Sequence, residues 1–289
     1  MAFSKMMSEF DTLHLLVFHT TLVTLILLEQ FPKFQREYFP TFRRWTSNIG
    51  LLLLNGFLTR VILPISVLAF AMAQPPGLMS AAGMPPPAQI FLGFVFLDFA
   101  QYWTHRLSHS VPLLWRVHLV HHSDTHIDVT TSQRRHPLES LFGSALSFFW
   151  VYLLGIPAEA FGLYILVATF VAIFSHANIS LPESVDRWLR HVIVTPGMHA
   201  IHHSSTQGQT DSNYAIVLAV WDRWFGTYTN PSRATVLHFG LEYFHQPKHT
   251  GLFNVLLQPF VYKTGMPYPA RNAPGNDAID GSGNDNLGS

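Results

Sequence analysis

The stretch FVFLDFAQYWTHRLSHSVPLLWRVHLVHH, residues 94–122, runs from an apolar segment directly into two histidine motifs. The first motif is HxxxH at 105–109, and the second is HxxHH at 118–122. A further HxxHH follows much later, at 199–203. Residues three and four positions apart share one face of an α-helix, so HxxxH offers two imidazoles to one side and HxxHH offers three. The pattern predicts eight metal ligands: His105, His109, His118, His121, His122, His199, His202 and His203.

Eight imidazole nitrogens are more than one metal ion can bind, so their number predicts two metal ions. The chain contains 17 histidines, and all but two of them lie between His105 and His249. At this chain's own histidine frequency, a random sequence of the same length would contain HxxHH about 0.06 times. Because the motif occurs twice, coincidence is a poor explanation.

Two other histidines lie where further ligands are expected. His176 directly follows the last strongly apolar segment, and His136 precedes another one at the same membrane depth. Both are predicted as additional ligands, with a capping or hydrogen-bonding role as the alternative for His136. The remaining histidines are predicted to be structural, solvated or interfacial: His14, His19, His126, His191, His238, His245 and His249.

The kind of metal is constrained by what the sequence lacks. Imidazole binds zinc, copper, iron and nickel alike. The chain has no cysteine, which excludes thiolate sites, iron–sulfur clusters and disulfides within it. The HExxH signature of zinc proteases is also missing. An all-nitrogen site for two iron ions (Fe²⁺/Fe³⁺) fits best, and zinc is expected to be able to replace iron on overexpression.

Composition indicates a membrane protein. Charged residues are 12% of the chain, whereas the ordinary share is about 25%. Each of five apolar segments is near the length of about 20 residues that a bilayer requires. They are 12–29, 49–73, 88–104, 138–156 and 158–175. Only Gly155-Ile156-Pro157 separates the last two, which predicts a tight helical hairpin, and Asn55, Arg60 and Pro64 in the second must face protein or water.

Charge placement predicts which side of the membrane each segment occupies. Alternate crossings place residues 30–48, 105–137 and everything after 176 on one side. That side carries all lysines and arginines except Lys5 and Arg60, so the positive-inside rule predicts that it is cytoplasmic. The histidine motifs lie on the same side. Basic and acidic residues are equal in number, and no nucleic-acid partner is expected.

The predicted fold is an all-α, integral-membrane helical bundle with four or five membrane helices and a cytosolic helical cap that holds the two-metal site. Residues 1–87 are predicted as N-terminal membrane helices, 88–263 as the catalytic domain and 264–289 as a disordered tail rich in Pro, Gly, Asn and Asp.

An apolar substrate is expected to enter laterally through a cleft lined by the last three spans, and the candidate lining residues are Phe94, Phe96, Trp103 and Phe149. Metal-bound histidines need partners for their second ring nitrogen. The candidate partners are Asp98, Asp124, Asp128, Glu139, Asp211 and Asp222.

The motifs, taken in order, resemble the fatty acid hydroxylase/sterol desaturase superfamily. The resemblance rests on DFAQYWTHRLSH at 98–109, HLVHH at 118–122 and TPGMHAIHHS at 195–204. RRHPLE at 134–139 and WDRWFGTY at 221–228 are similar to flanking patterns of its bacterial branch. The similar region covers roughly 90–240, and the family's ligand roles carry over to the eight motif histidines.

The resemblance implies a non-haem di-iron enzyme that uses O₂ as co-substrate to hydroxylate or desaturate a fatty acyl, sterol, hopanoid-like or other lipid taken from the bilayer. Together with the charge placement, the similarity to the bacterial branch predicts a bacterial inner-membrane location with the metal site on the cytoplasmic face. The chain has no HPGG haem signature, so the electron donor is expected to be separate, either a ferredoxin or a cytochrome b5-like protein with its reductase. One branch of the family has a histidine four residues after the position of His176, where this chain has Ser180.

Two other classes of protein remain as alternatives from the residues alone. A membrane-embedded zinc hydrolase would work without O₂ or reductant. A metal transporter would carry its ligands near mid-bilayer rather than at the membrane surface.

Overall fold

The structure is a computed structural model that describes residues 2–31, 42–63, 66–231, 237–244 and 246–263. Within these residues every regular element is a helix, and β-structure is limited to two isolated bridges. The helices are α1 (Ala2–Glu29), α2 (Phe42–Ile62), α3 (Val67–Ala73), α4 (Leu78–Ala81), α5 (Pro86–Ser110), α6 (Pro112–His122), η1 (Val129–Gln133), α7 (Pro137–Leu154), α8 (Ala158–His176), α9 (Glu183–Leu189), α10 (Pro196–His202), α11 (Gln207–Thr210), α12 (Val220–Trp224), η3 (Glu242–Phe244), η4 (Pro247–Thr250) and α13 (Leu252–Val261). The expected all-α class is confirmed.

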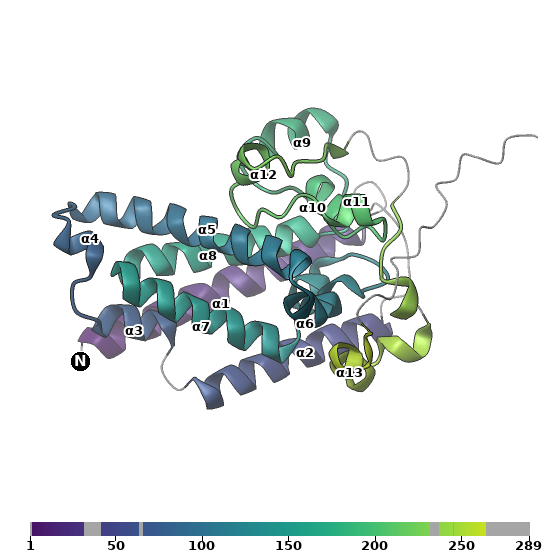
Figure 1. Ribbon diagram of the computed structural model, residues 1–289, viewed down its shortest axis with the longest axis horizontal. Coiled ribbons are helices and arrows are strands. Elements are labelled where there is room, and N and C mark those ends of the chain that lie inside the picture. The colour runs from purple at the N-terminus through teal and green to yellow at the C-terminus, as the bar shows by residue number, and fades with distance from the viewer. Residues whose placement is uncertain (1, 32–41, 64–65, 232–236, 245, 264–289) are drawn as a thin grey trace, which may run out of the picture.

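The long helices lie lengthwise in one bundle, and the short helices gather at one end of it (Figure 1). α8 is central and packs against both α1 and α5, while α7 packs against α2 and α3. α6 packs on α5, α10 packs on α8, and α13 packs on α6 and α2. The helices that carry the histidine motifs therefore meet where α5 and α8 end.

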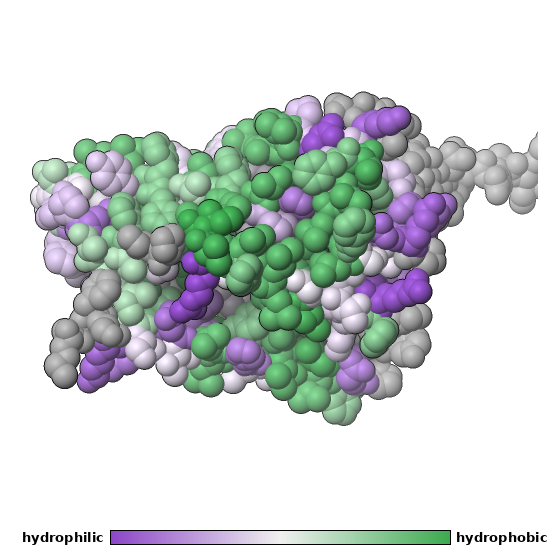
Figure 2. Space-filling view, turned by 90° about the horizontal axis from the view of Figure 1, so that it is seen from below, coloured by the Kyte–Doolittle hydropathy of each residue, from purple (hydrophilic) through white to green (hydrophobic). Residues whose placement is uncertain are grey.

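Four segments of the described chain are long and apolar enough to cross a membrane: Lys5–Glu29, Phe42–Ala81, Pro137–Leu154 and Ala158–His176. Many of their apolar side chains point outward, as Leu16, Leu53 and Tyr152 do with more than half of their surface exposed. Figure 2 shows one such face of the bundle, which is largely hydrophobic with isolated hydrophilic residues. Water is a poor solvent for such a surface, so the chain is an integral membrane protein.

One expected span differs from the structure. The segment 88–104 lies inside α5, which has 25 residues but is not among the four spanning candidates. α5 is more polar than a membrane helix because its inner side serves the site. Asp98 is buried there and accepts hydrogen bonds from the backbone amides of Val217 and Leu218.

The predicted tight turn between the last two spans is present, and glycine makes it possible, but α7 and α8 do not pack on each other as a close hairpin would. Gly155 caps the C-terminus of α7 with a φ of 66°, a left-handed conformation that glycine adopts without strain. A Cβ atom on Gly155 would lie 2.5 Å from the Cα of Gly77, so the two backbones touch. α8 then begins one turn later, after Pro157.

Several predictions concern residues outside the described ranges. They include the disordered tail at 264–289, Pro64, His245 and the loop cations Lys33 and Arg36. The domain boundary at 87/88 stays a prediction, although α5 begins close to it, at Pro86.

Candidate metal centre

Nine histidines gather into two buried groups. The first group consists of His105, His109, His118, His122 and His202, and the second of His121, His176, His199 and His203. Within each group, one ring nitrogen of every member lies within 4.8 Å of the corresponding nitrogens of the others. The groups are neighbours, because the rings of His122 and His203 stack with centroids 4.7 Å apart. The structure thus brings together all eight motif histidines and His176.

Each HxxHH motif divides its histidines between the two groups. In α6, His118 and His122 belong to the first group, whereas His121 belongs to the second. At α10 the division is reversed: His199 lies in the second group together with the following His203, whereas His202 lies in the first. The cause is the helix repeat of 3.6 residues, since neighbouring residues point about 100° apart. The expectation that one motif offers three imidazoles to one side needs this correction.

The nitrogen spacing in the second group fits ligands of one ion. The Nε2 atom of His176 lies 3.2 Å from that of His121, 3.0 Å from that of His199 and 3.2 Å from that of His203. Two nitrogens that bind one ion at about 2.1 Å are about 3.0 Å apart at a right angle and about 3.4 Å apart at a tetrahedral angle. In the first group, the Nε2 atoms of His118 and His122 are likewise 3.2 Å apart.

Hydrogen bonds at the other ring nitrogen fix which tautomer is present. The Nδ1 atom of His121 lies 3.2 Å from the carbonyl of Arg134, and that of His176 lies 2.7 Å from the carbonyl of Ala172. Carbonyl oxygens only accept, so each Nδ1 carries the proton and each Nε2 presents a lone pair. Two lone pairs that face each other at 3.2 Å repel unless a cation lies between them. This arrangement fits a bound metal ion.

The first group is oriented in the same way. His105 donates through Nδ1 to the carbonyl of Tyr214 at 2.7 Å, and His202 donates to that of Ser212 at 2.8 Å. The Nε2 atoms of both rings are buried without a hydrogen-bond partner in the described chain, as is that of His109. A buried nitrogen left without a partner costs about 1–3 kcal/mol, which a metal–nitrogen bond would offset.

Burial keeps the imidazoles neutral. The pKa values of His121, His122, His199 and His203 are held well below 6.5. Burial is the main cause, and the neighbouring imidazoles add to it. Burial also lowers the pKa of His202, to about 3. A neutral imidazole has a lone pair available for a metal ion, so these residues can bind one at neutral pH without first losing a proton.

Two of the six acidic candidates contact the histidines directly. Glu139 accepts from Nδ1 of His118 at 2.8 Å, and Asp211 lies 3.3 Å from Nδ1 of His109. The other four bond to the surrounding backbone or to side chains other than the histidines. Asp222, for example, accepts from the amides of Tyr214 and Ala215 and thereby holds the carbonyl that orients His105.

His136 does not join either group. It is the N-cap of α7, where Nδ1 accepts from the amide of Leu138 at 3.2 Å, and its Nε2 lies 3.3 Å from the carbonyl of Leu256. Both ring nitrogens are therefore engaged in holding α7 and α13. This is the alternative role that the sequence left open.

Several residues of the site carried no sequence signal. The carbonyls that orient His105, His121 and His202 could not be recognised, because every residue has one. Asn213 lies between two of these carbonyls at a φ of 54° and bonds to Met198 and Thr229. Glu29 is buried at the end of α1 and accepts from the amides of Val129 and Asn178, the latter two residues after His176. A charged residue at the end of an apolar helix is the only available signal.

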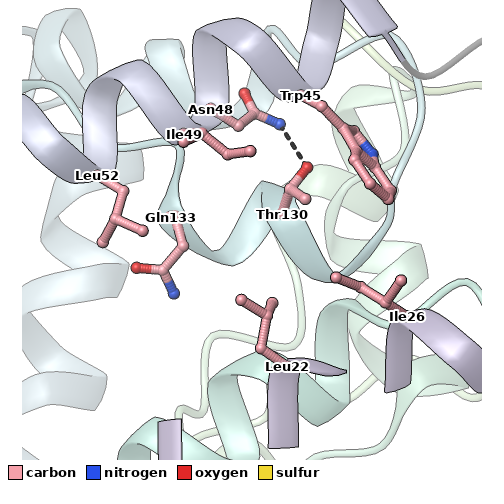
Figure 3. Close-up of a pocket in the computed structure, with 8 residues that line it drawn as sticks. All are labelled: Leu22, Ile26, Trp45, Asn48, Ile49, Leu52, Thr130 and Gln133. Atoms are coloured by element: carbon pink, nitrogen blue, oxygen red, sulfur yellow. Dashed lines mark hydrogen bonds between the residues drawn. The ribbon is translucent and has the colours of Figure 1, made fainter. Parts of the chain in front are cut away.

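A pocket between α1, α2 and η1 lies apart from the histidines (Figure 3). Its lining is mainly apolar, with Leu22 and Ile26 of α1 across from Trp45 and Leu52 of α2, and no histidine contributes to it. The four aromatic residues predicted to line a substrate cleft do not line this pocket. Phe94 packs on Tyr164 and Phe96 packs on Trp150 instead.

Fold and site together define an integral-membrane helical protein with two adjacent polyhistidine groups suited to metal ions. Residues 90–227 match the model of the fatty acid hydroxylase family. The resemblance inferred from the motifs is confirmed.

Three relatives illustrate the range of the family. The ornithine lipid hydroxylase OlsE of Rhizobium tropici is 33% identical over 62% of this chain and 52% of its own length. The alkylglycerol monooxygenase of Xenopus tropicalis is 32% identical over 51% of this chain and 32% of its own length. Methylsterol monooxygenase 2-2 of Arabidopsis thaliana is 28% identical over 58% of this chain and 64% of its own length. The chain thus spans about half or less of the first relatives, and no solved structure matches it.

Proposed function

We propose that this protein is an O₂-dependent lipid hydroxylase or desaturase in which each histidine group holds one iron ion. The observation that carries the proposal is the pair of buried groups whose imidazole lone pairs converge without protons between them. The names of the relatives, which include lipid hydroxylases and monooxygenases, support the same reaction class. Iron bound there would supply the redox chemistry that activates O₂ and oxidises an unactivated C–H bond.

The residues of the chain contribute position, charge and exclusion of water. All nine histidines of the two groups are largely buried, which keeps bulk water away from a reactive centre. Glu139 and the carbonyls of Tyr214, Ser212 and Arg134 fix ring orientation, and such partners typically raise metal affinity about 10–100-fold. The imidazoles are neutral, so they leave the charge of the ions to be balanced by other anions.

The substrate is proposed to reach the centre from the bilayer, since the helices that carry the site belong to a membrane bundle. We place the protein in the bacterial inner membrane with the centre on the cytoplasmic side, as the distribution of lysine and arginine favours. The chain has no electron-carrying motif of its own in its sequence, so a separate ferredoxin or cytochrome b5-like protein with its reductase is proposed as donor.

The test is metal analysis combined with turnover. Protein is purified without an affinity His-tag from iron-replete cells, and we expect two iron ions per chain together with lipid oxidation that requires both O₂ and reductant. Zinc-loaded protein from the same chain is the control and should be inactive. Hydrolysis of a lipid by the zinc form under anaerobic conditions would instead establish the hydrolase alternative.

A further inference from the structure

The RRHPLE segment contains one residue with no assigned role. The carbonyl of Arg134 orients His121, and His136 caps α7. Arg135 lies between them with an exposed side chain. Within the described ranges, its guanidinium has no hydrogen bond, ion pair or aromatic partner.

The backbone of Arg135, by contrast, is held in place. Its amide donates to the carbonyl of Gln133 at 3.0 Å, and its carbonyl accepts from the side-chain amide of Asn55 in α2 at 2.9 Å. The base of the side chain is therefore positioned between α2 and the start of α7, although its charged end is free. A fixed base with a free charged end is what a ligand-binding arginine requires.

Two buried oxygen atoms beside this point also lack partners in the described chain. One is Oδ1 of Asn55, the residue that bonds to Arg135. The other is Oε2 of Glu139, which lies in the first turn of α7, four positions after Arg135, and whose second oxygen accepts from His118. A buried acceptor without a donor costs about 1–3 kcal/mol. Arg135, which has a free charged end, is thus joined through its carbonyl to Asn55 and followed four positions later by Glu139, and both of these residues have an acceptor in need of a donor.

The surroundings are apolar and close to the metal centre. Leu53 and Phe57 flank Asn55 on α2, and Leu138 and Phe142 follow Arg135 on α7, all with exposed side chains. α7 is a candidate membrane span that begins two residues after Arg135, so the guanidinium lies at the polar end of a lipid-facing surface. The residue directly before Arg135, Arg134, contacts His121 of the second group through its carbonyl at 3.2 Å.

We propose that Arg135, Asn55 and Glu139 form a binding site for the polar headgroup of the lipid substrate. Arginine binds carboxylate or phosphate oxygens with paired hydrogen bonds. Asn55 Oδ1 and Glu139 Oε2 accept hydrogen bonds from a hydroxyl or ammonium group. The preferred headgroup therefore combines an anionic oxygen with a neighbouring hydrogen-bond donor.

This site would position the substrate of the proposed lipid oxidation, so its role in turnover rests on the proposed function. Glu139 contacts the headgroup site with one oxygen and His118 of the first group with the other. A lipid held here has its polar end beside the metal centre. Oxidation is therefore directed to a carbon near the headgroup rather than to the far end of an acyl chain.

The experiment measures binding of three short-chain, water-soluble lipids to the detergent-solubilised, iron-loaded protein. Dihexanoyl phosphatidylglycerol has both a phosphate and hydroxyl donors, dihexanoyl phosphatidylcholine has a phosphate without donors, and dihexanoylglycerol has a hydroxyl without an anion. We expect the first to bind most tightly. The Arg135→Gln variant should weaken that binding by about tenfold or more, equivalent to about 1.4 kcal/mol, while Arg135→Lys keeps part of it.

Arg187→Gln is the matched control, because Arg187 is an exposed arginine on α9 whose loss should leave binding unchanged. Iron content and melting temperature show that each variant is folded. Equal affinity of Arg135→Gln and unaltered protein for phosphatidylglycerol would overturn the inference, as would equal binding of dihexanoylglycerol. Competition by inorganic phosphate alone at matched concentration would also overturn it, since that result assigns the site to free phosphate.

The binding readout is independent of turnover. If phosphatidylglycerol binding depends on Arg135 but no lipid is oxidised with O₂ and reductant, the headgroup site stands and the proposed function fails. If lipid is oxidised and binding does not depend on Arg135, the proposed function stands and this inference fails. A paramagnetic broadening of the ³¹P signal of bound phosphatidylglycerol by the loaded metal is expected and places the headgroup beside the centre.

Discussion

His121 and His122 are adjacent in sequence, yet they belong to different metal groups. The reason is geometric, since a step of one residue turns the side chain by about 100° around the helix axis. An HxxHH motif therefore contributes to both groups, with its first and fifth positions in one group and its fourth position in the other. Because both motifs do this in opposite senses, each helix contributes to both groups, and the two sites form together.

At the residue scale, His176 and His136 should behave differently. Replacing His176 with Ala removes one of four nitrogens from the second group. We expect about one metal ion per chain to be lost, with the first group still occupied. Replacing His136 with Ala should leave the metal content unchanged and destabilise the protein by about 1 kcal/mol, the usual effect of losing a helix N-cap. Metal analysis and thermal melting measure the two effects.

His191→Ala is the control for this pair, because His191 is exposed just after α9 and belongs to neither group. The His191→Ala variant should change neither the metal content nor the melting temperature. Loss of metal from the His136 variant at unchanged melting temperature would contradict the capping role and restore His136 as a ligand.

At the scale of elements, α2 is joined to the segment between α6 and η1 by a buried ionic network. The guanidinium of Arg44 donates to both oxygens of Asp124, at 2.5 and 2.7 Å, and to Asp128 at 2.8 Å. Burial alone would raise the pKa of Asp124, but the charges of Arg44 and Arg134 hold it below its ordinary value. The network fixes the chain that follows His121 and His122.

Replacing Arg44 with Met should therefore be costly. It leaves the carboxylates of Asp124 and Asp128 buried with too few partners, and breaking a buried ion pair on one side typically costs about 3–5 kcal/mol. We expect a clearly lower melting temperature and weaker retention of both metal ions. The neighbouring Arg43 is exposed, and Arg43→Met should have little effect. Equal melting temperatures of the two variants would show that the network does not stabilise the site.

The sequence predicted the helices and the histidines for a physical reason: apolar runs and i, i+3, i+4 spacing are local properties. It therefore identified four spanning segments, the tight turn at Gly155 and the eight motif histidines that the fold brings together. It could not separate His136 from His176, because their difference lies in what surrounds them in space. His136 contacts the carbonyl of Leu256, far along the chain, whereas His176 faces His199.

The reason for the polarity of α5 could also not be predicted from its own sequence. Asp98 inside an apolar run is explained only by the segment it holds, where Trp221 donates to it at 2.8 Å. The arginine at 44 gave no signal of its own, since an arginine between two membrane segments is ordinarily read as a topology signal. Only the fold shows that it is buried against Asp124.

At the scale of the whole molecule, the polyhistidine core links folding to pH. Burial, followed by the effect of neighbouring imidazoles, holds the pKa values of His121, His122, His199 and His203 below 6.5, and burial lowers that of His202 to about 3. In the unfolded chain these residues titrate near 6.5. Between the two values the unfolded state binds more protons than the folded state, so the free energy of unfolding falls as the pH falls.

The metal-free protein should therefore have a stability that is constant above a pH of about 6.5 and decreases below it, by about 1.4 kcal/mol per pH unit for each such histidine. Melting temperatures of the metal-free protein in detergent, measured from neutral to mildly acidic pH, test this. The metal-loaded protein should resist the same acidification until protons displace the ions, since bound metal keeps the rings neutral. His191→Gln should leave the pH profile unchanged, because His191 is exposed. A metal-free melting temperature that does not change with pH over this range would mean that the nine rings do not share one buried core.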